Sequence, residues 1–166
     1  MRAFLAVLLI CLSGPAWADG SLFSMQSRED GRPWEAVGRL ELAGKAFCTG
    51  ALIAPDLVLT AAHCLFDAET GARIPAGQIQ FLAGWRNGRA AAYRRVRRAI
   101  AHPSYDFTAP KDGDRVSSDV ALIELQLPIR NTTIQPFATG PHPAIGSEVS
   151  VVSYAHDRSE APSLQG

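Results

Sequence analysis

The stretch that decides the fold reads Cys48-Thr-Gly-Ala-Leu-Ile-Ala-Pro-Asp-Leu-Val-Leu-Thr-Ala-Ala-His-Cys64. It contains two short apolar runs, residues 51–53 and 57–59, which are separated by the turn residues Pro55 and Asp56. Apolar runs of this length around a turn predict a tight β-hairpin whose two strands both face a core.

A cysteine stands at each end of this stretch, and His63 directly precedes the second one. A bond between Cys48 and Cys64 would close a loop of about 15 residues and stabilise the fold by roughly 3 kcal/mol in the chain-entropy model. Its local effect matters more, because it would fix the backbone that carries His63.

The stretch resembles the histidine segment of the chymotrypsin/trypsin family of serine proteases. The matching residues are Cys48-Thr49-Gly50, Leu52-Ile53 and Val58-Leu59-Thr60-Ala61-Ala62-His63-Cys64. The resemblance implies that His63 is the catalytic general base. Without these flanking residues, His63 would be interpreted as a buried, hydrogen-bonded histidine at the end of a strand.

A second landmark is Asp119, which directly precedes the apolar run 120–125. By the same resemblance Asp119 is the triad carboxylate, which accepts the Nδ1 proton of His63 and stabilises the imidazolium that forms. We expect the His63 Nδ1 and this carboxylate to lie within a hydrogen-bond distance of about 3 Å. Three other acidic residues are interpreted as loop carboxylates: Asp106, Asp112 and Asp114. His102 lies in a weaker family match, residues 100–105, and is expected to pack or cap there without a catalytic role.

A triad also requires a nucleophile, which in this family lies in a Gly-x-Ser-Gly-like turn. Ser147 follows Gly146 but lacks the flanking glycines whose N–H groups form an oxyanion hole. The remaining candidates sit in no such turn either: Ser153, Ser159 and Ser163. The resemblance runs from Trp34 to Ala155, so we expect a chain truncated before the nucleophile and inactive by itself.

Composition and length agree with one all-β domain. The chain has 166 residues, enough for a core, and its 16 basic and 16 acidic residues balance. This balance does not indicate binding to nucleic acid or to a membrane surface. Short apolar runs with many Gly and Pro residues favour strands over helices. The predicted fold is a trypsin-like antiparallel Greek-key β-barrel with few helices, its first barrel complete and its second only begun.

The N-terminus has the features of a processing signal. Residues 1–18 read as a signal peptide, because an apolar run too short to span a bilayer ends at the cleavage motif Ala16-Trp17-Ala18. Cys11 lies in that run and is removed with it. Cys48 and Cys64 then form the only pair, which predicts one disulfide and a secreted or periplasmic location.

Residues 19–33 are polar and read as a propeptide-like arm, and residues 34–166 as the protease domain. Trypsin-like zymogens are activated through a new N-terminus that begins Ile-Val-Gly-Gly, and Pro33-Trp34-Glu35-Ala36-Val37-Gly38 stands in its place. The sequence looks more similar to the bacterial glutamyl-endopeptidase-like branch of the family. The standard insertion of a new N-terminus is therefore not indicated.

Further strands are expected over residues 34–42, 79–83, 90–101 and 148–154, with loops over 65–78 and 106–118 and a proline-rich connection over 128–143. The strand at 90–101 carries four arginines, Arg94, Arg95, Arg97 and Arg98. They form either a solvated strand face or a basic binding patch. The zero net charge and the lack of interleaved aromatics favour the solvated face.

Together these features predict the N-terminal portion of an exported trypsin-like serine endopeptidase that acts on a protein or peptide substrate. No metal-ligand cluster, phosphate loop or membrane span is found, so no cofactor, no metal and no nucleic-acid partner is expected. One alternative is a catalytically inactive, protease-like secreted binding module, against which the presence of both His63 and Asp119 argues. The other is a structural or adhesive secreted β-domain that converged on the same motif.

Overall fold

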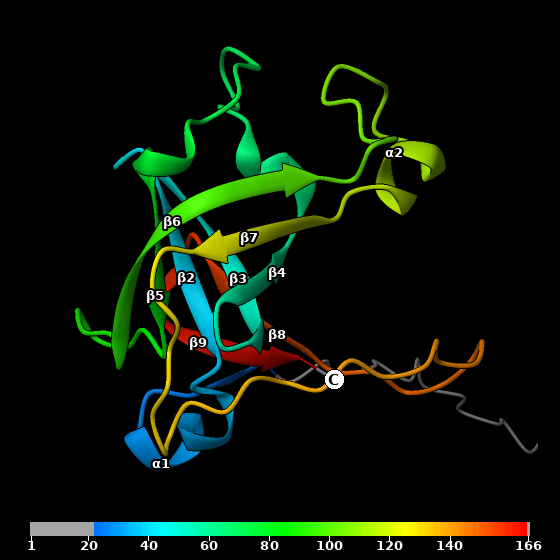
Figure 1. Ribbon diagram of the computed structural model, residues 1–166. Coiled ribbons are helices and arrows are strands. Elements are labelled where there is room, and N and C mark those ends of the chain that lie inside the picture. The colour runs from blue at the N-terminus through cyan, green and yellow to red at the C-terminus, as the bar shows by residue number, and fades with distance from the viewer. Residues whose placement is uncertain (1–21, 166) are drawn as a thin grey trace, which may run out of the picture.

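The computed structural model describes residues 22–165, which fold mainly into antiparallel strands (Figure 1). Six strands form a closed barrel in the order β2-β3-β4-β7-β6-β5, and three more form a small sheet in the order β1-β9-β8. The barrel strands are β2 (Val37–Leu42), β3 (Ala46–Ala54), β4 (Leu57–Thr60), β5 (Ile79–Ala83), β6 (Ala92–Ala101) and β7 (Ala121–Leu125). The predicted all-β class and antiparallel barrel are confirmed.

The predicted hairpin forms as β3 and β4. Leu52 pairs with Val58, both side chains are fully buried, and a β-bulge follows between Leu52 and Ala54. The carbonyls of the connecting turn accept two hydrogen bonds from outside the hairpin. Leu125 N–H donates to Asp56 O at 2.8 Å, and Ile129 N–H donates to Pro55 O at 2.7 Å. The end of β7 and the segment that follows it thus hold the turn in place.

The barrel core takes one or two large apolar side chains from each strand. Leu40 of β2, Phe81 of β5 and Ile123 of β7 are each completely buried. Gly38 has to be glycine at the point where β2 crosses the Phe81 ring, because a Cβ atom there would lie 2.3 Å from the ring and 2.7 Å from the carbonyl of Leu82.

The small sheet joins the two ends of the described chain. β1 (Phe23–Ser24) pairs with β9 (Arg158–Gln165), which pairs in turn with β8 (Val151–Ala155). Met25, in the segment interpreted as an arm, is 1% exposed. Residues 22–33 therefore pack against the fold, while the predicted signal peptide at residues 1–18 lies outside the described residues.

Several local elements differ from the predicted ones. The strand expected from Trp34 begins at Val37, because Pro33 starts a 3-10 helix over Arg32–Trp34. A further 3-10 helix, Ala62–Leu65, ends where the expected loop 65–78 begins, and that loop holds another, Ala76–Gln78. The expected loop 106–118 holds the short helix α2 (Gly113–Ser117), which is capped by Asp112. The remaining helix, α1 (Arg28–Gly31), and strand β9 were not predicted. Among residues 22–165, no helix is long and apolar enough to cross a membrane.

Gly38→Ala is expected to lower the free energy of unfolding by about 1–3 kcal/mol, the usual cost of overpacking a core. The added methyl group would meet the Phe81 ring and a backbone carbonyl, so relief requires movement of the barrel wall. Gly77→Ala is the matched control, because a Cβ atom there has nothing within 4 Å. Urea unfolding of both variants measures the effect, and equal midpoints would contradict the close packing of Gly38 against Phe81.

Candidate functional site

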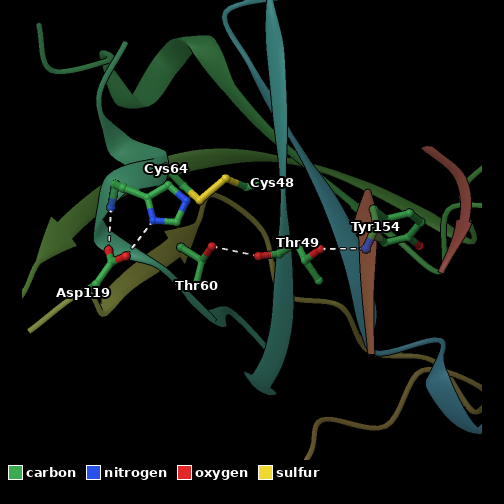
Figure 2. Close-up of a disulfide and its surroundings, with 7 residues drawn as sticks. Cys48, Thr49, Thr60, Cys64, Asp119 and Tyr154 are labelled. Carbon is green, nitrogen blue, oxygen red and sulfur yellow. Dashed lines mark hydrogen bonds and ion pairs between the residues drawn. A yellow bond between two sulfur atoms is a disulfide. The ribbon is translucent and has the colours of Figure 1, made fainter. Parts of the chain in front are cut away.

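His63 lies three residues after the end of β4, where the chain leaves the strand. Ala62–Leu65 form a 3-10 helix, in which Ala62, Cys64 and Leu65 are buried while the His63 side chain is 52% exposed. The predicted disulfide joins Cys48 and Cys64, whose Cα atoms are 6.1 Å apart (Figure 2). It ties the helical turn to β3, so the backbone on both sides of His63 is anchored and its imidazole faces solvent.

Asp119 reaches His63 through the pairing of β4 with β7, in which Thr60 lies opposite Ala121. Asp119 Oδ2 lies 2.7 Å from His63 Nδ1, and Asp119 Oδ1 accepts the backbone N–H of His63 at 2.8 Å (Figure 2). The expected contact is therefore present, together with a backbone bond that the sequence did not predict. One carboxylate fixes both the ring and the main chain of the same residue.

Two of the other loop carboxylates form hydrogen bonds elsewhere. Asp106 binds Thr108, and Asp112 accepts the Arg115 N–H at the start of α2. His102 Nδ1 accepts the Ser104 N–H at 3.2 Å, which is the capping role predicted for it. The structure thus separates Asp119 from its neighbours in sequence.

Two opposing effects act on the pKa of Asp119. Partial burial of the carboxyl raises the pKa, but the hydrogen bonds from the His63 ring and backbone outweigh it, so the pKa lies below the ordinary value of 3.8. Asp119 is consequently ionised at neutral pH. An ionised carboxylate on Nδ1 favours the imidazole tautomer that carries its proton on Nδ1, which leaves the Nε2 lone pair free to accept a proton.

A chain of hydrogen bonds connects β4, the strand before His63, to the small sheet. Thr60 Oγ1 donates to Thr49 O at 2.8 Å, and Thr49 Oγ1 accepts the Tyr154 N–H at 2.9 Å (Figure 2). Burial raises the pKa of the Tyr154 phenol, which stays protonated and donates to Trp85 O. The neighbouring strands β4, β3 and β8 are therefore bound together behind the site.

A cavity of about 510 Å³ opens beside the His63–Asp119 pair, and the loop before β7 supplies most of its wall. Tyr105 and Phe107 line it, as does Arg115, whose guanidinium lies 5.1 Å from the Phe107 ring centre and donates to Ala109 O. Sequence reasoning assigned these residues no role. The alternation of aromatic and polar residues at 105–108 was the available signal.

The sulfur and nitrogen atoms of Cys48, His63 and Cys64 lie within 4.8 Å of one another, a spacing that metal ligands can have. The two sulfurs are bonded to each other, so neither is a thiolate that could bind a metal ion. This donor set does not fit a metal.

The backbones of the candidate serines make contacts elsewhere in the described part of the chain. Ser153 and Ser163 pair across β8 and β9, Ser147 N–H closes a turn onto Ala144 O, and Ser159 O accepts the Trp85 Nε1–H. Among residues 22–165, no serine hydroxyl is hydrogen-bonded to His63. The described site thus contains a base and a carboxylate that orients it.

Comparison with known proteins gives a consistent set of matches. The Trypsin family model matches residues 24–165. Mast cell protease 3 of Ovis aries is 31% identical over 126 residues, which cover 73% of this chain and 44% of that protein. Human cathepsin G is 30% identical over 140 residues, which cover 83% of this chain and 50% of that protein. The chain thus spans about half the length of these curated relatives.

Among solved structures, a Glu endopeptidase in complex with MPD has a similar fold. The TM-score is 0.69 at 18% sequence identity, over 90% of this chain and 67% of that one.

The bonds of Asp119 to His63 are expected to stabilise the fold only where the carboxylate is ionised. The folded-state pKa is depressed, so this contribution is present above the ordinary pKa of 3.8 and is lost as the pH falls through the lower folded value. We expect Asp119→Asn to unfold at lower urea concentration than the wild-type chain at pH 6, and the difference to shrink as the pH falls below 3.8.

Asp114→Asn serves as the control, because the Asp114 side chain lies outside the pair on exposed α2. Urea midpoints measured across the acid range give the result. A wild-type advantage over Asp119→Asn that is constant with pH, or an equal effect of Asp114→Asn, would contradict the assignment.

Proposed function

Because the chain belongs to the trypsin family, we propose that it carries the general base and the orienting carboxylate of a serine endopeptidase. The observation that supports this proposal best is the double contact of Asp119 with His63, at the ring Nδ1 and at the backbone N–H. A carboxylate that only closed a turn would accept the backbone N–H of His63 without also binding its imidazole ring. A partly exposed imidazole next to a cavity is also open to a substrate.

In the proposed reaction, His63 Nε2 accepts the proton of a serine hydroxyl as its oxygen attacks the carbonyl of the scissile peptide bond. His63 then gives this proton to the departing amine. In the second half of the reaction, His63 accepts a proton from water as it attacks the acyl group, and returns that proton to the serine oxygen. Asp119 accepts the Nδ1–H throughout and stabilises the imidazolium in each half of the reaction. Asp119 itself stays ionised, which agrees with its lowered pKa.

We propose that the nucleophile and the oxyanion hole come from sequence that follows Gly166. The described serines support this proposal, because His63 is hydrogen-bonded to Asp119 and to no serine hydroxyl among residues 22–165. The length of the matched relatives supports it too, since this chain covers 50% or less of each. Under the proposal, this chain alone does not hydrolyse peptides.

We propose an exported, bacterial protein that is secreted or periplasmic and acts on proteins or peptides, with residues 1–18 as its signal peptide. The Cys48–Cys64 disulfide supports export, because such bonds persist in oxidising compartments. Residues 19–33 are proposed as a propeptide-like arm before a protease domain at 34–166. The pairing of β1 with β9 supports an arm that stays docked on the domain it precedes.

A serine-directed fluorophosphonate probe tests the proposed function on a longer form of the protein that extends past Gly166. We expect labelling at one serine beyond Gly166, and none on the 166-residue chain alone. Turnover should fall about a millionfold in His63→Ala and about ten-thousandfold in Asp119→Asn, as in comparable triads.

His102→Ala is the matched control, because His102 caps a turn outside the pair and should leave labelling and turnover unchanged. Labelling of a serine within residues 22–165 that is lost in His63→Ala would refute the proposed place of the nucleophile. Full turnover in His63→Ala of the longer form would refute the base assignment.

A further inference from the structure

Positive charge is concentrated in one part of this neutral chain. Residues 70–105 contain no aspartate or glutamate, although the chain has 16 acidic residues in all. The same segment holds seven arginines: Arg73, Arg86, Arg89, Arg94, Arg95, Arg97 and Arg98. Although the net charge is zero, positive and negative residues are therefore separated along the sequence. Whether these arginines share one surface depends on the fold.

A β-bulge in β6 turns three of these side chains to one face of the barrel. Val96 is 1% exposed, so Arg95 and Arg97 on either side of it point outward. The register of β6 against β7 then shifts between Val96 and Arg98, which keeps Arg98 outward as well. The Arg97 and Arg98 side chains are 62% and 66% exposed. In a regular strand, two consecutive side chains would point to opposite faces, and one of them would be buried.

The acidic group on this face neutralises only part of the charge. Glu124 on β7 pairs with Arg97 through one oxygen and with Arg98 through the other, both at 3.2 Å. No hydrogen bond or ion pair joins the Arg95 side chain to any of the described residues 22–165, and the Arg73 guanidinium donates to the carbonyl of Ala99 on the same strand. Glu124 thus pairs with two of these guanidinium groups, each of which keeps further N–H donors. Glu41, in the same cross-strand row as Gln80 and Arg95, is paired with Arg39.

A shallow groove of about 300 Å³ adjoins Arg95. Gln78 and Gln80 line it together with Gly77 and Ile79, and Gln80 lies opposite Arg95 in the pairing of β5 with β6. Side-chain amides both donate and accept hydrogen bonds, so such a groove suits a ligand rich in hydroxyl groups. Tyr93 is the one aromatic residue of β6, and its hydroxyl accepts the Ala90 N–H.

We propose that Arg73, Arg95, Arg97 and Arg98, with the adjoining glutamine groove, form a binding site for a sulfated polysaccharide. The guanidinium fork matches the oxygens of a sulfate group, and a polymer with repeated sulfates engages several arginines at once. The sugar hydroxyls meet the glutamine amides. A nucleic acid is the less suitable polyanion, because single-stranded bases are held by stacking on several aromatic side chains.

Binding of a fluorescent heparin octasaccharide to the full chain, followed by anisotropy, tests the proposal. We expect saturable binding that weakens between about 50 and about 200 mM salt, as contacts to a polyanion do. Arg95→Gln with Arg98→Gln leaves the Arg97–Glu124 pair intact and should weaken binding about tenfold or more at low salt. Arg95→Lys with Arg98→Lys keeps the charge and should weaken it less.

Arg32→Gln with Lys111→Gln removes the same charge outside the barrel sheet and is the matched control, expected to change binding by less than about twofold. Thermal unfolding shows whether each variant is folded. If the variant with two glutamines does not fold, the binding affinity of the variant with two lysines is compared with that of the wild-type chain. Absence of salt-sensitive binding, equal weakening by the control, equal binding of desulfated heparin, or tighter binding of single-stranded DNA would each overturn the proposal.

Discussion

The antiparallel pairing of β4 with β7 is the interaction on which the rest of the structure depends. It joins the β3–β4 hairpin to the strands that follow, and without it the six strands would form an open sheet. The same pairing sets Thr60 opposite Ala121, which brings the residues just beyond each strand end together. Barrel closure and the His63–Asp119 contact thus follow from one set of backbone hydrogen bonds.

The disulfide and the Asp119 carboxylate act on the same short turn from opposite sides. Cys64 is tied to β3 by a covalent bond, and His63 is held toward β7 by two hydrogen bonds. Behind them, Thr49 is bonded to both Thr60 and Tyr154, so the supporting strands cannot shift independently. An exposed imidazole gains a fixed orientation from this arrangement without being buried.

The sequence predicted the parts of the fold that local chemistry determines. Pro55 and Asp56 between two apolar runs were enough for the hairpin, and the apolar run after Asp119 was enough for β7. β9 was missed because its sequence, with Glu160 and Pro162, has no strand pattern, and it becomes a strand through pairing with β1 and β8.

For the site as well, the sequence predicted the parts that local motifs determine. His63, Asp119 and the disulfide were identified from motifs, whereas the backbone bond from His63 to Asp119 requires a turn geometry that no motif specifies. Arg115 and Phe107 were missed because they reach the cavity through the path of a loop. The bulge that gathers Arg97 and Arg98 likewise depends on how β6 meets β7.

The separation of the two site residues along the chain has a consequence for the order of folding. The β3–β4 hairpin joins residues close in sequence, so its loop-closure cost is small, whereas Asp119 lies 56 residues beyond His63. We therefore expect the hairpin that carries His63 to form before β7 brings Asp119 to it. On this expectation, formation of the His63–Asp119 contact in a growing or refolding chain reports that the barrel has closed.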